Sequence, residues 1–374
     1  MSVNWQWVAD DAQLADVMAA ANQQQSVAID TEFMRTNTFY PEVALLQVCF
    51  DDVAWLIDPL AISDTSPIRA LFQNDNVLKV LHSASEDLEV FDRWLGVLPE
   101  PLCDSQKAAA LLGKGFGLGY RALVAMECDI DLPKGETRSN WLQRPLTDSQ
   151  CDYAALDVIH LFALWHKLEQ DLRAAGRLEW LIDEGRIATG HRVTDGSEYY
   201  KRIKSAWKLD RRQLACLMML SRWRETQARA RNKPRSWIVD DQAVLQIAQL
   251  LPQSLTSLGS SEFTLQSQAL RRYGEDLIQV VAEAVALDES ALPQRMPAPL
   301  PAEFRGRAKA LKSRARVIAE SLNLAPELLL QSKDYDILLR ESIGQDVAVP
   351  PHWNGWRAPT VIEPLRDYLS GGDT

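Results

Sequence analysis

Two acidic residues, Asp30 and Glu32, stand inside a run of apolar and β-branched residues at positions 27–33. The composition of this run predicts a strand. Because side chains alternate across a strand, both carboxylates point to the same face and lie close together. Neighbouring carboxylates on an apolar strand repel each other and lose hydration unless a cation lies between them. The pair therefore predicts a metal site, although an exposed edge strand would also tolerate it.

A second acidic segment begins at residue 147. Thr147 and Gln150 match the capping-box pattern, and an amphipathic helix is expected from 148 to about 170. Tyr153 and Asp157 are four residues apart in this helix, so they lie on one of its faces. An ordinary amphipathic helix with a solvated Asp and a half-exposed Tyr would show the same spacing.

A third acid, Asp87, follows another predicted strand. Residues 77–81 are apolar enough to form a strand that ends at His82, and Ser83 or Ser85 is expected to cap the next helix. Asp87 falls in the first turn of that helix, where a carboxylate also interacts favourably with the helix dipole. Each of the three segments can thus be explained without a functional site. Only their order along the chain points to a function.

That order resembles the DEDDy branch of the DEDD 3′-5′ exonucleases, the branch that includes bacterial ribonuclease D. Further stretches resemble the same family: Asp30–Arg35 with Thr38–Pro41, Leu56–Leu60, His82–Glu89, Asp104–Gln106, and Thr137–Trp141 with Arg144–Thr147. The resemblance extends over nearly the whole chain. It implies a ribonuclease H-like α/β fold with a mixed sheet, followed by all-α HRDC-type helical modules.

The resemblance also implies a two-metal site that holds Mg²⁺ or Mn²⁺. Its metal ligands would be Asp30, Glu32, Asp87 and Asp157, and Tyr153 would orient the attacking water. Hard divalent ions prefer oxygen ligands, and two of them can stabilise both the attacking and the leaving oxygen of a phosphodiester. A tyrosine with an ordinary pKa near about 10 orients a water better than it deprotonates one.

The implied activity is removal of 3′-terminal nucleotides as nucleoside 5′-monophosphates from transfer RNA precursors and other structured RNA. Two alternatives remain open: a DNA 3′-5′ exonuclease with the same constellation, and a catalytically silent RNA-binding scaffold. A silent site would have lost one or more of its acids, and all four are present.

Other residues are candidates for substrate binding. Phe33 and Tyr40 could stack on the terminal bases, although core packing explains either ring as well. His82 is a further candidate. Basic candidates are Arg211, Arg212, Arg229 and Arg231.

The formal charge of −11 is unevenly distributed. Residues 1–195 have a net charge of −15 and residues 196–374 a net charge of +4. Residues 200–235 contain 12 Lys and Arg against only Asp210 and Glu225. This density is typical of contact with a phosphate backbone, so we expect RNA as the partner; a solvated basic surface would have the same composition.

A second basic run contains no acid. Four of its residues share one helical face, Arg305, Lys309, Lys312 and Arg316. A solvated face and RNA contact both fit this pattern.

Periodicity divides the chain into four parts. Strands and helices interleave at 1–170, a helical connector follows at 171–207, and helices form two further parts at 208–290 and 296–374. The resemblance implies that these are an exonuclease domain, the connector, an HRDC domain and a second HRDC-like helical domain. No apolar run reaches 18 residues and the N-terminus has no signal-peptide pattern, so we expect a cytoplasmic protein with no membrane partner. We also expect a monomer. The five cysteines lack the spacing of a disulfide framework or a zinc site.

Overall fold

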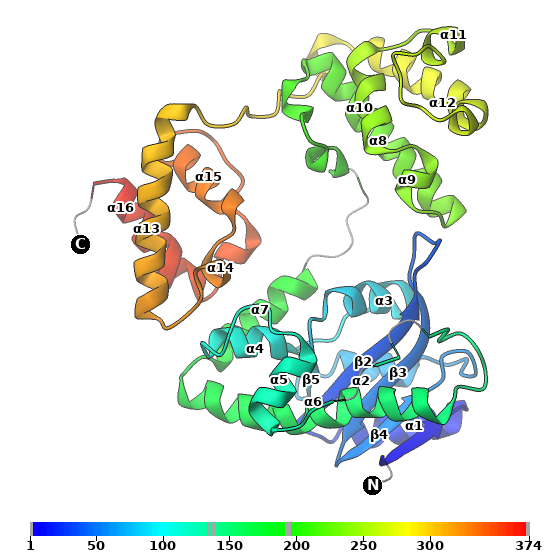
Figure 1. Cartoon of the computed structure of the whole chain (residues 1–374), viewed down its shortest axis with the longest axis vertical. Helices are drawn as coiled ribbons and strands as arrows, with labels where there is room; N and C mark the ends of the chain where they lie inside the picture. Colours follow the sequence, from blue (N-terminus) through cyan, green and yellow to red (C-terminus); the bar gives the residue numbers. More distant parts are fainter. Residues whose placement is uncertain (1–2, 133–134, 137–138, 191–195, 197, 372–374) are drawn as a thin grey trace. The chain divides into compact units, whose positions relative to one another are not determined.

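The structure is a computed structural model that describes residues 3–132, 135–136, 139–190, 196 and 198–371 (Figure 1). Thr137 and Arg138 of the family-like motifs lie outside the described residues. The chain forms two compact units. The first comprises Met1–Met34, Glu42–Arg192 and Leu300–Thr374, and the second Arg35–Pro41 and Val193–Pro299. Within the described ranges, no helix has the length and apolar character needed to cross a membrane.

A mixed six-stranded sheet forms the centre of the first unit, as predicted. Its strands are β1 Trp5–Val8, β2 Ser26–Met34, β3 Glu42–Phe50, β4 Val53–Ile57, β5 Leu78–Leu81 and β6 Leu102–Asp104. Their order across the sheet is β1-β4-β3-β2-β5-β6. β3 runs antiparallel to β2 and β4, while β1, β5 and β6 run parallel to their neighbours β4, β2 and β5. The acid-bearing β2 is therefore an interior strand, not the exposed edge strand considered above.

Helices cover both faces of this sheet. Three helices contribute to the core on one face, α1 Asp11–Ala21, α2 Ser66–Phe72 and α3 Ser85–Leu95. Three others cover the opposite face, α4 Ser105–Leu111, α5 Tyr120–Cys128 and α6 Asp148–Ala174. The long α6 runs across the strands and contacts β1 to β5 (Figure 1). Val27, Ala28 and Ile29 are all fully buried because the alternating side chains of β2 meet a core on either side.

The second unit is helical. It contains α8 Arg211–Arg231, α9 Arg235–Ile238, α10 Asp241–Leu250, α11 Leu255–Leu258 and α12 Ser267–Val285. Asp210 and Gln213 form a capping box at the start of α8, and Asn232 ends the helix in the left-handed conformation with a φ of 48°. The Asn232 side-chain oxygen accepts hydrogen bonds from the backbone N–H groups of Phe39 and Tyr40, each 3.0 Å long. The loop between β2 and β3 thus belongs to the helical unit.

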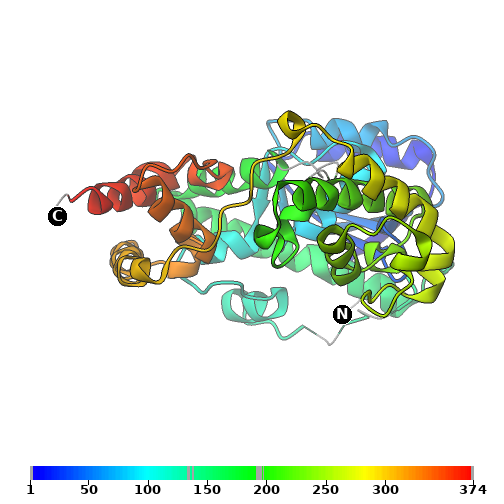
Figure 2. The same ribbon diagram turned by 90° about the horizontal axis from the view of Figure 1, so that it is seen from above.

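The C-terminal segment folds around one helix, α13 Arg305–Ser321. Three shorter helices contact it, α14 Pro326–Leu329, α15 Ser332–Glu341 and α16 Glu363–Leu369. In Figure 2 α13 is seen nearly end-on, with the other three helices on one side of it. Their apolar faces form part of the same core cluster as α6.

Contacts with α7 Leu178–Gly190 join this segment to the rest of the first unit. The rings of Trp180 and Trp356 stack with their centroids 4.6 Å apart. Glu184 of α7 forms an ion pair with the buried Arg357 and accepts a 2.8 Å hydrogen bond from the Trp356 indole. Trp353 is buried as well, so these aromatic residues are core residues and not a surface for stacking bases.

Candidate active site

Strand β2 presents the first two acids. Asp30 lies opposite Gln47 of β3, and Glu32 lies opposite Leu45. The register then shifts, because Phe33 pairs with Val43 and leaves Ala44 as an extra residue on β3. The side chains of Asp30 and Glu32 share the face that α6 covers. Both are half-buried, which leaves them accessible to a substrate.

Asp87 reaches the site from α3. Its carboxylate is buried and accepts a hydrogen bond from the hydroxyl of Thr31, the residue between the two acids of β2. The prediction that Ser83 or Ser85 caps α3 is wrong: Ala84 is the N-cap residue and provides no side-chain cap. Asp104 accepts hydrogen bonds from the backbone N–H groups of Ser83 and Ala84 instead, 2.9 and 3.1 Å long. Asp104 thus holds the turn that leads into α3 and does not cap the helix itself.

Helix α6 carries Tyr153 and Asp157. The predicted capping box is confirmed, since Thr147 Oγ1 accepts from the Gln150 N–H at 3.2 Å and Gln150 Oε1 from the Thr147 N–H at 3.0 Å. Tyr120 of α5 donates its hydroxyl hydrogen to the Asp157 carbonyl at 2.6 Å, and so fixes the helix beside the acid. Nothing in the sequence around Tyr120 indicated this role.

Charges at the site show how closely the acids approach one another. Partial burial, followed by repulsion from Asp157 and Asp87, raises the pKa of Glu32 to about 9. Burial, followed by the carboxylates of Asp87, Asp157 and Glu32, holds the pKa of Asp30 well above its ordinary range. The other three acids are therefore within electrostatic reach of Asp30.

The pKa values of Asp87, Asp157 and Tyr153 are raised as well. Burial raises the pKa of Asp87 to about 6, against the hydrogen bond from Thr31, which lowers it. Burial raises the pKa of Asp157 to about 7, and the Tyr153 hydroxyl opposes this by favouring the charged carboxylate. Burial, followed by the charge of Asp157, raises the pKa of Tyr153, so this hydroxyl keeps its proton at neutral pH.

The donor set fits hard divalent cations. Four carboxylates supply only oxygen ligands, and their raised pKa values show that positive charge would stabilise them. Across the described part of the chain, however, no three Asp, Glu, His or Cys side chains are already drawn together closely enough to hold one ion. The acids are grouped around β2 but are not preassembled as a coordination sphere.

Gly135 is a site residue that sequence reasoning missed. A Cβ atom at this position would lie 2.0 Å from Cε2 and 2.8 Å from the hydroxyl oxygen of Tyr153. The next residue, Glu136, accepts a 2.9 Å hydrogen bond from the Ser149 hydroxyl in the first turn of α6. Its loop is thereby fastened to the helix that carries Tyr153. The only signal in the sequence was a glycine ahead of the capped helix.

Arg144 connects α6 to the acid-bearing part of the sheet. Its guanidinium forms a two-pronged ion pair with the buried Asp58, with distances of 2.8 and 2.6 Å. It also donates a 2.6 Å hydrogen bond to the carbonyl of Ala44, the extra residue of β3 beside Glu32. The family-like motifs that contain Asp58 and Arg144 thus hold the site together.

The predicted aromatic and histidine residues have different surroundings. Phe33 is half-buried at the end of β2, next to Glu32. Tyr40 belongs to the helical unit, where its ring makes an edge contact with Phe39 at 4.8 Å. His82 is half-buried, with Nδ1 2.8 Å from the Ser105 hydroxyl, and burial lowers its pKa.

Three of the four basic candidates bond to backbone carbonyls or to a carboxylate. Arg211 donates to the carbonyls of Glu289 and Leu292 at 2.9 and 2.8 Å. Arg212 donates to the carbonyls of Val285 and Leu287 at 2.6 and 2.8 Å, beyond the end of α12. Arg229 forms a 2.8 Å ion pair with Glu225.

Arg231 differs from the other three. It is exposed, and among the described residues no carboxylate pairs with it. Of these four candidates, Arg211, Arg212 and Arg229 therefore help to hold the helical unit together, and Arg231 faces solvent.

Comparisons with known proteins agree with this architecture. Residues 5–173 match the family model described as 3′-5′ exonuclease, and residues 213–281 match the HRDC domain model. The chain is 43% identical to ribonuclease D of Pseudomonas paraeruginosa over 367 residues, covering 97% of both chains. It is 36% identical to ribonuclease D of Escherichia coli over 98% of this chain and 99% of that one.

The crystal structure of the Escherichia coli enzyme superposes with a TM-score of 0.92 at 34% identity, covering 99% of this chain and all of that one. That enzyme is described as an exoribonuclease involved in structured RNA processing. Enzymes of this exonuclease family depend in general on divalent metal ions. The chain belongs to the ribonuclease D family of 3′-5′ exoribonucleases.

Proposed function

We propose that Asp30, Glu32, Asp87 and Asp157 hold two divalent ions, Mg²⁺ or Mn²⁺, and that Tyr153 orients the attacking water. The observation that carries this proposal is the mutual repulsion of four half-buried or buried carboxylates from β2, α3 and α6. When bound, the ions would supply an activated water and stabilise negative charge on the reacting phosphate.

The side chains of this chain perform the remaining tasks. Tyr153 keeps its proton and donates it in a hydrogen bond to Asp157, so its hydroxyl oxygen can accept a hydrogen bond from the water and direct it towards phosphorus. The Thr31 hydroxyl holds the Asp87 carboxylate, and the Tyr120 hydroxyl holds α6 at Asp157, so that the ligands approach from fixed directions. Phe33 beside Glu32 is a candidate for stacking on the terminal base.

The substrate that we propose is the 3′ end of structured RNA, with transfer RNA precursors as the main class and nucleoside 5′-monophosphates as products. The membership of the ribonuclease D family supports this choice over DNA. We further propose the four-part division at 1–170, 171–207, 208–290 and 296–374, with the last part a divergent HRDC-like domain. Action as a cytoplasmic monomer stays a prediction.

The test uses three labelled oligonucleotides, a 3′-extended RNA, the matching DNA and a 3′-blocked RNA, with Mg²⁺ or Mn²⁺ and then with chelator. Only the first should be shortened rapidly, and only with metal. Full activity on the blocked RNA or in chelator would contradict the two-metal 3′-exonuclease, and equal turnover of DNA would contradict the RNA assignment.

A variant pair tests the ligand assignment. Asp157→Asn should lower the hydrolysis rate at least about a thousandfold, because it removes one charged ligand, and should leave RNA binding in chelator unchanged. Asp148→Asn is the matched control, since Asp148 is an exposed carboxylate in the first turn of the same helix. If both variants lose activity equally, Asp157 is not a specific ligand.

A further inference from the structure

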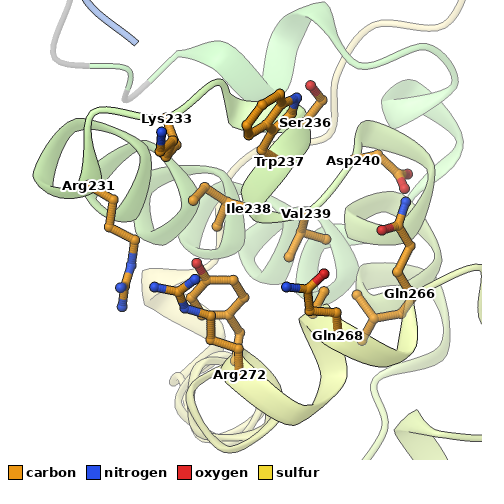
Figure 3. A pocket seen from close by; sticks show the side chains of 13 residues that line it. Arg231, Lys233, Ser236, Trp237, Ile238, Val239, Asp240, Gln266, Gln268 and Arg272 are labelled. Carbon is orange, nitrogen blue, oxygen red and sulfur yellow. The ribbon is translucent and has the colours of Figure 1, made fainter. Parts of the chain in front are cut away.

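The helical unit contains a groove of about 590 Å³ between the end of α8, the short α9 and the start of α12 (Figure 3). Pockets that bind small molecules typically measure about 300 to 1,000 Å³. The space is therefore sufficient for a nucleotide. None of the candidate residues considered above except Arg231 lines it.

The floor of the groove is apolar and fixed. Ile238, Val239 and Tyr273 line it and are buried. The ring of Tyr273 makes an edge contact with Trp223 of α8, with the centroids 5.5 Å apart. Because these side chains belong to the core of the unit, the floor keeps its shape when the groove is empty or filled.

An exposed tryptophan stands on the rim. Trp237 of α9 is 58% exposed, the largest exposed fraction among the large hydrophobic side chains described. The Lys233 ammonium lies 5.7 Å from the centre of its ring. A tryptophan that lines a groove and still faces solvent offers a free aromatic face, which is the surface on which unpaired bases stack.

Three basic side chains border the same groove. The guanidinium groups of Arg231 and Arg272 lie 5.3 and 5.5 Å from the centre of the Tyr273 ring, which gives both a defined position. Together with Lys233 they are exposed, and none of the three forms an ion pair with any residue that the structure describes. This distinguishes them from the paired Arg224, whose partner is Asp241.

The groove has two chemically different ends. Figure 3 shows Arg231, Lys233 and Arg272 at one end, and Asp240, Gln266 and Gln268 at the other. The Asp240 carboxylate is engaged as the N-cap of α10, where it accepts a 2.8 Å hydrogen bond from the Ala243 N–H. Positive charge at one end matches a phosphate, and the amide groups at the other can form hydrogen bonds with a base edge.

We propose that this groove binds one unpaired nucleotide of an RNA strand. The base stacks on Trp237 over the apolar floor, and the phosphate lies between Arg231, Lys233 and Arg272. Stacking and phosphate contact are chemistry that single-stranded RNA and DNA share, and the choice of RNA rests on the proposed function of the enzyme.

The experiment measures binding of a 5′-fluorescein-labelled single-stranded RNA to the full chain by fluorescence anisotropy, in chelator so that hydrolysis does not occur. Trp237→Ala should weaken binding about tenfold, the effect of losing one stacked base. Arg272→Gln should weaken binding and reduce the dependence of log Kd on log salt concentration by about 0.7, the contribution of one phosphate contact on a single strand.

Two matched controls keep the test specific. Trp207→Ala removes another exposed tryptophan of the helical unit, which also has a lysine, Lys208, 5.5 Å from its ring. Arg271→Gln removes an exposed arginine adjacent to Arg272 that does not line the groove. Both should bind RNA as the wild-type protein does.

Each outcome has a defined meaning. If Trp237→Ala binds RNA as tightly as Trp207→Ala while the wild-type enzyme degrades RNA normally, the groove assignment is overturned and the proposed function stands. If the wild-type enzyme fails to degrade RNA but Trp237→Ala still weakens binding, the proposed function fails and the groove stands. A DNA strand of the same sequence that binds equally well, with the same loss in Trp237→Ala, would overturn the assignment to RNA.

Discussion

Gly135 and Tyr153 are in such close contact that no side chain fits between them: a Cβ atom on Gly135 would lie 2.0 Å from Cε2 of the tyrosine ring. Any larger residue must therefore move the ring or the loop. The position of the Tyr153 ring thus depends on a residue that has no side chain.

We expect Gly135→Ala to lower kcat for RNA hydrolysis about a hundredfold, because displacing a positioned group by about 1 Å can cost that much. Single-turnover kinetics would measure the effect, and RNA binding in chelator should not change. Gly119→Ala is the matched control, since Gly119 has no atom within 4 Å of an added Cβ and a φ of −71° that alanine adopts readily. Equal activity of the two variants would show that Gly135 does not position Tyr153.

Removal of divalent ions should make stability decrease as the pH rises. The folded-state pKa values of Glu32, Asp157 and Asp87, about 9, 7 and 6, lie above the ordinary values of about 4. Between the ordinary and the folded-state pKa values, the folded state therefore binds more protons than the unfolded state. The contribution of these carboxyl groups to stability is complete below about pH 4 and is lost as the pH rises through their folded-state pKa values.

Calorimetry in chelator would check this by comparing the Tm of wild type and Glu32→Gln from pH 5 to 9. Wild type should lose more Tm across this range than the variant, in which one of the titrating carboxylates is absent. Saturating Mg²⁺ should raise the Tm of wild type most at high pH, because the ions compete with protons for the ligands. A steeper loss in Glu32→Gln than in wild type would contradict the assigned shift.

Arg144→Ala should destabilise the protein by about 3 kcal/mol, because it leaves the buried Asp58 without its partner. Urea unfolding would measure the change. Arg121→Ala is a suitable comparison, since Arg121 forms a short ion pair with Asp131 in which the two side chains are 47% and 80% exposed. Its loss should cost less than about 1 kcal/mol. Similar costs for the two variants would mean that the contact with Asp58 is no stronger than a surface pair.

The exposed face of α13 should contribute to RNA affinity through charge alone. Lys309 and Arg316 are exposed and form no ion pair with any described residue. If each contacts one phosphate, the double variant Lys309→Gln/Arg316→Gln should lower the salt dependence of binding by about 1.4. Arg173→Gln/Arg186→Gln removes the same charge from exposed residues that already pair with Glu169 and Asp183, and should leave the slope unchanged. If both double variants show the same dependence of log Kd on log salt concentration, the exposed face of α13 is a solvated surface that does not contact RNA.

Local patterns in the sequence were sufficient to predict much of the fold. The run at 27–33 gave a buried strand, and Thr147 with Gln150 gave the start of α6, because both depend on residues close in sequence. Residues with distant partners could not be assigned in this way. Arg211 and Arg212 looked like RNA ligands, yet they bond to carbonyls more than 70 residues away. Charge density alone does not reveal whether such a partner exists.

The same limit applies to the contact of Gly135 with Tyr153 and to the hydrogen bonds that Asp104 accepts from the N–H groups of Ser83 and Ala84 ahead of α3. Both contacts join segments that only the completed fold brings together. The groove beside Trp237 is a further example, since α9 and α12 that line it are separated by about 30 residues of other structure.

The loop Arg35–Pro41 makes the acid-bearing strand β2 unsuitable for exchange between relatives without the helical unit. It continues directly from β2, but Phe39 is buried, and the guanidinium groups of Arg229 and Arg235 lie 5.1 and 4.6 Å from the centre of its ring. Grafting the exonuclease fold without its helical insert would uncover that ring and leave the N–H groups of Phe39 and Tyr40 without their acceptor on Asn232. The exonuclease domain and the helical unit therefore have to be exchanged between relatives together.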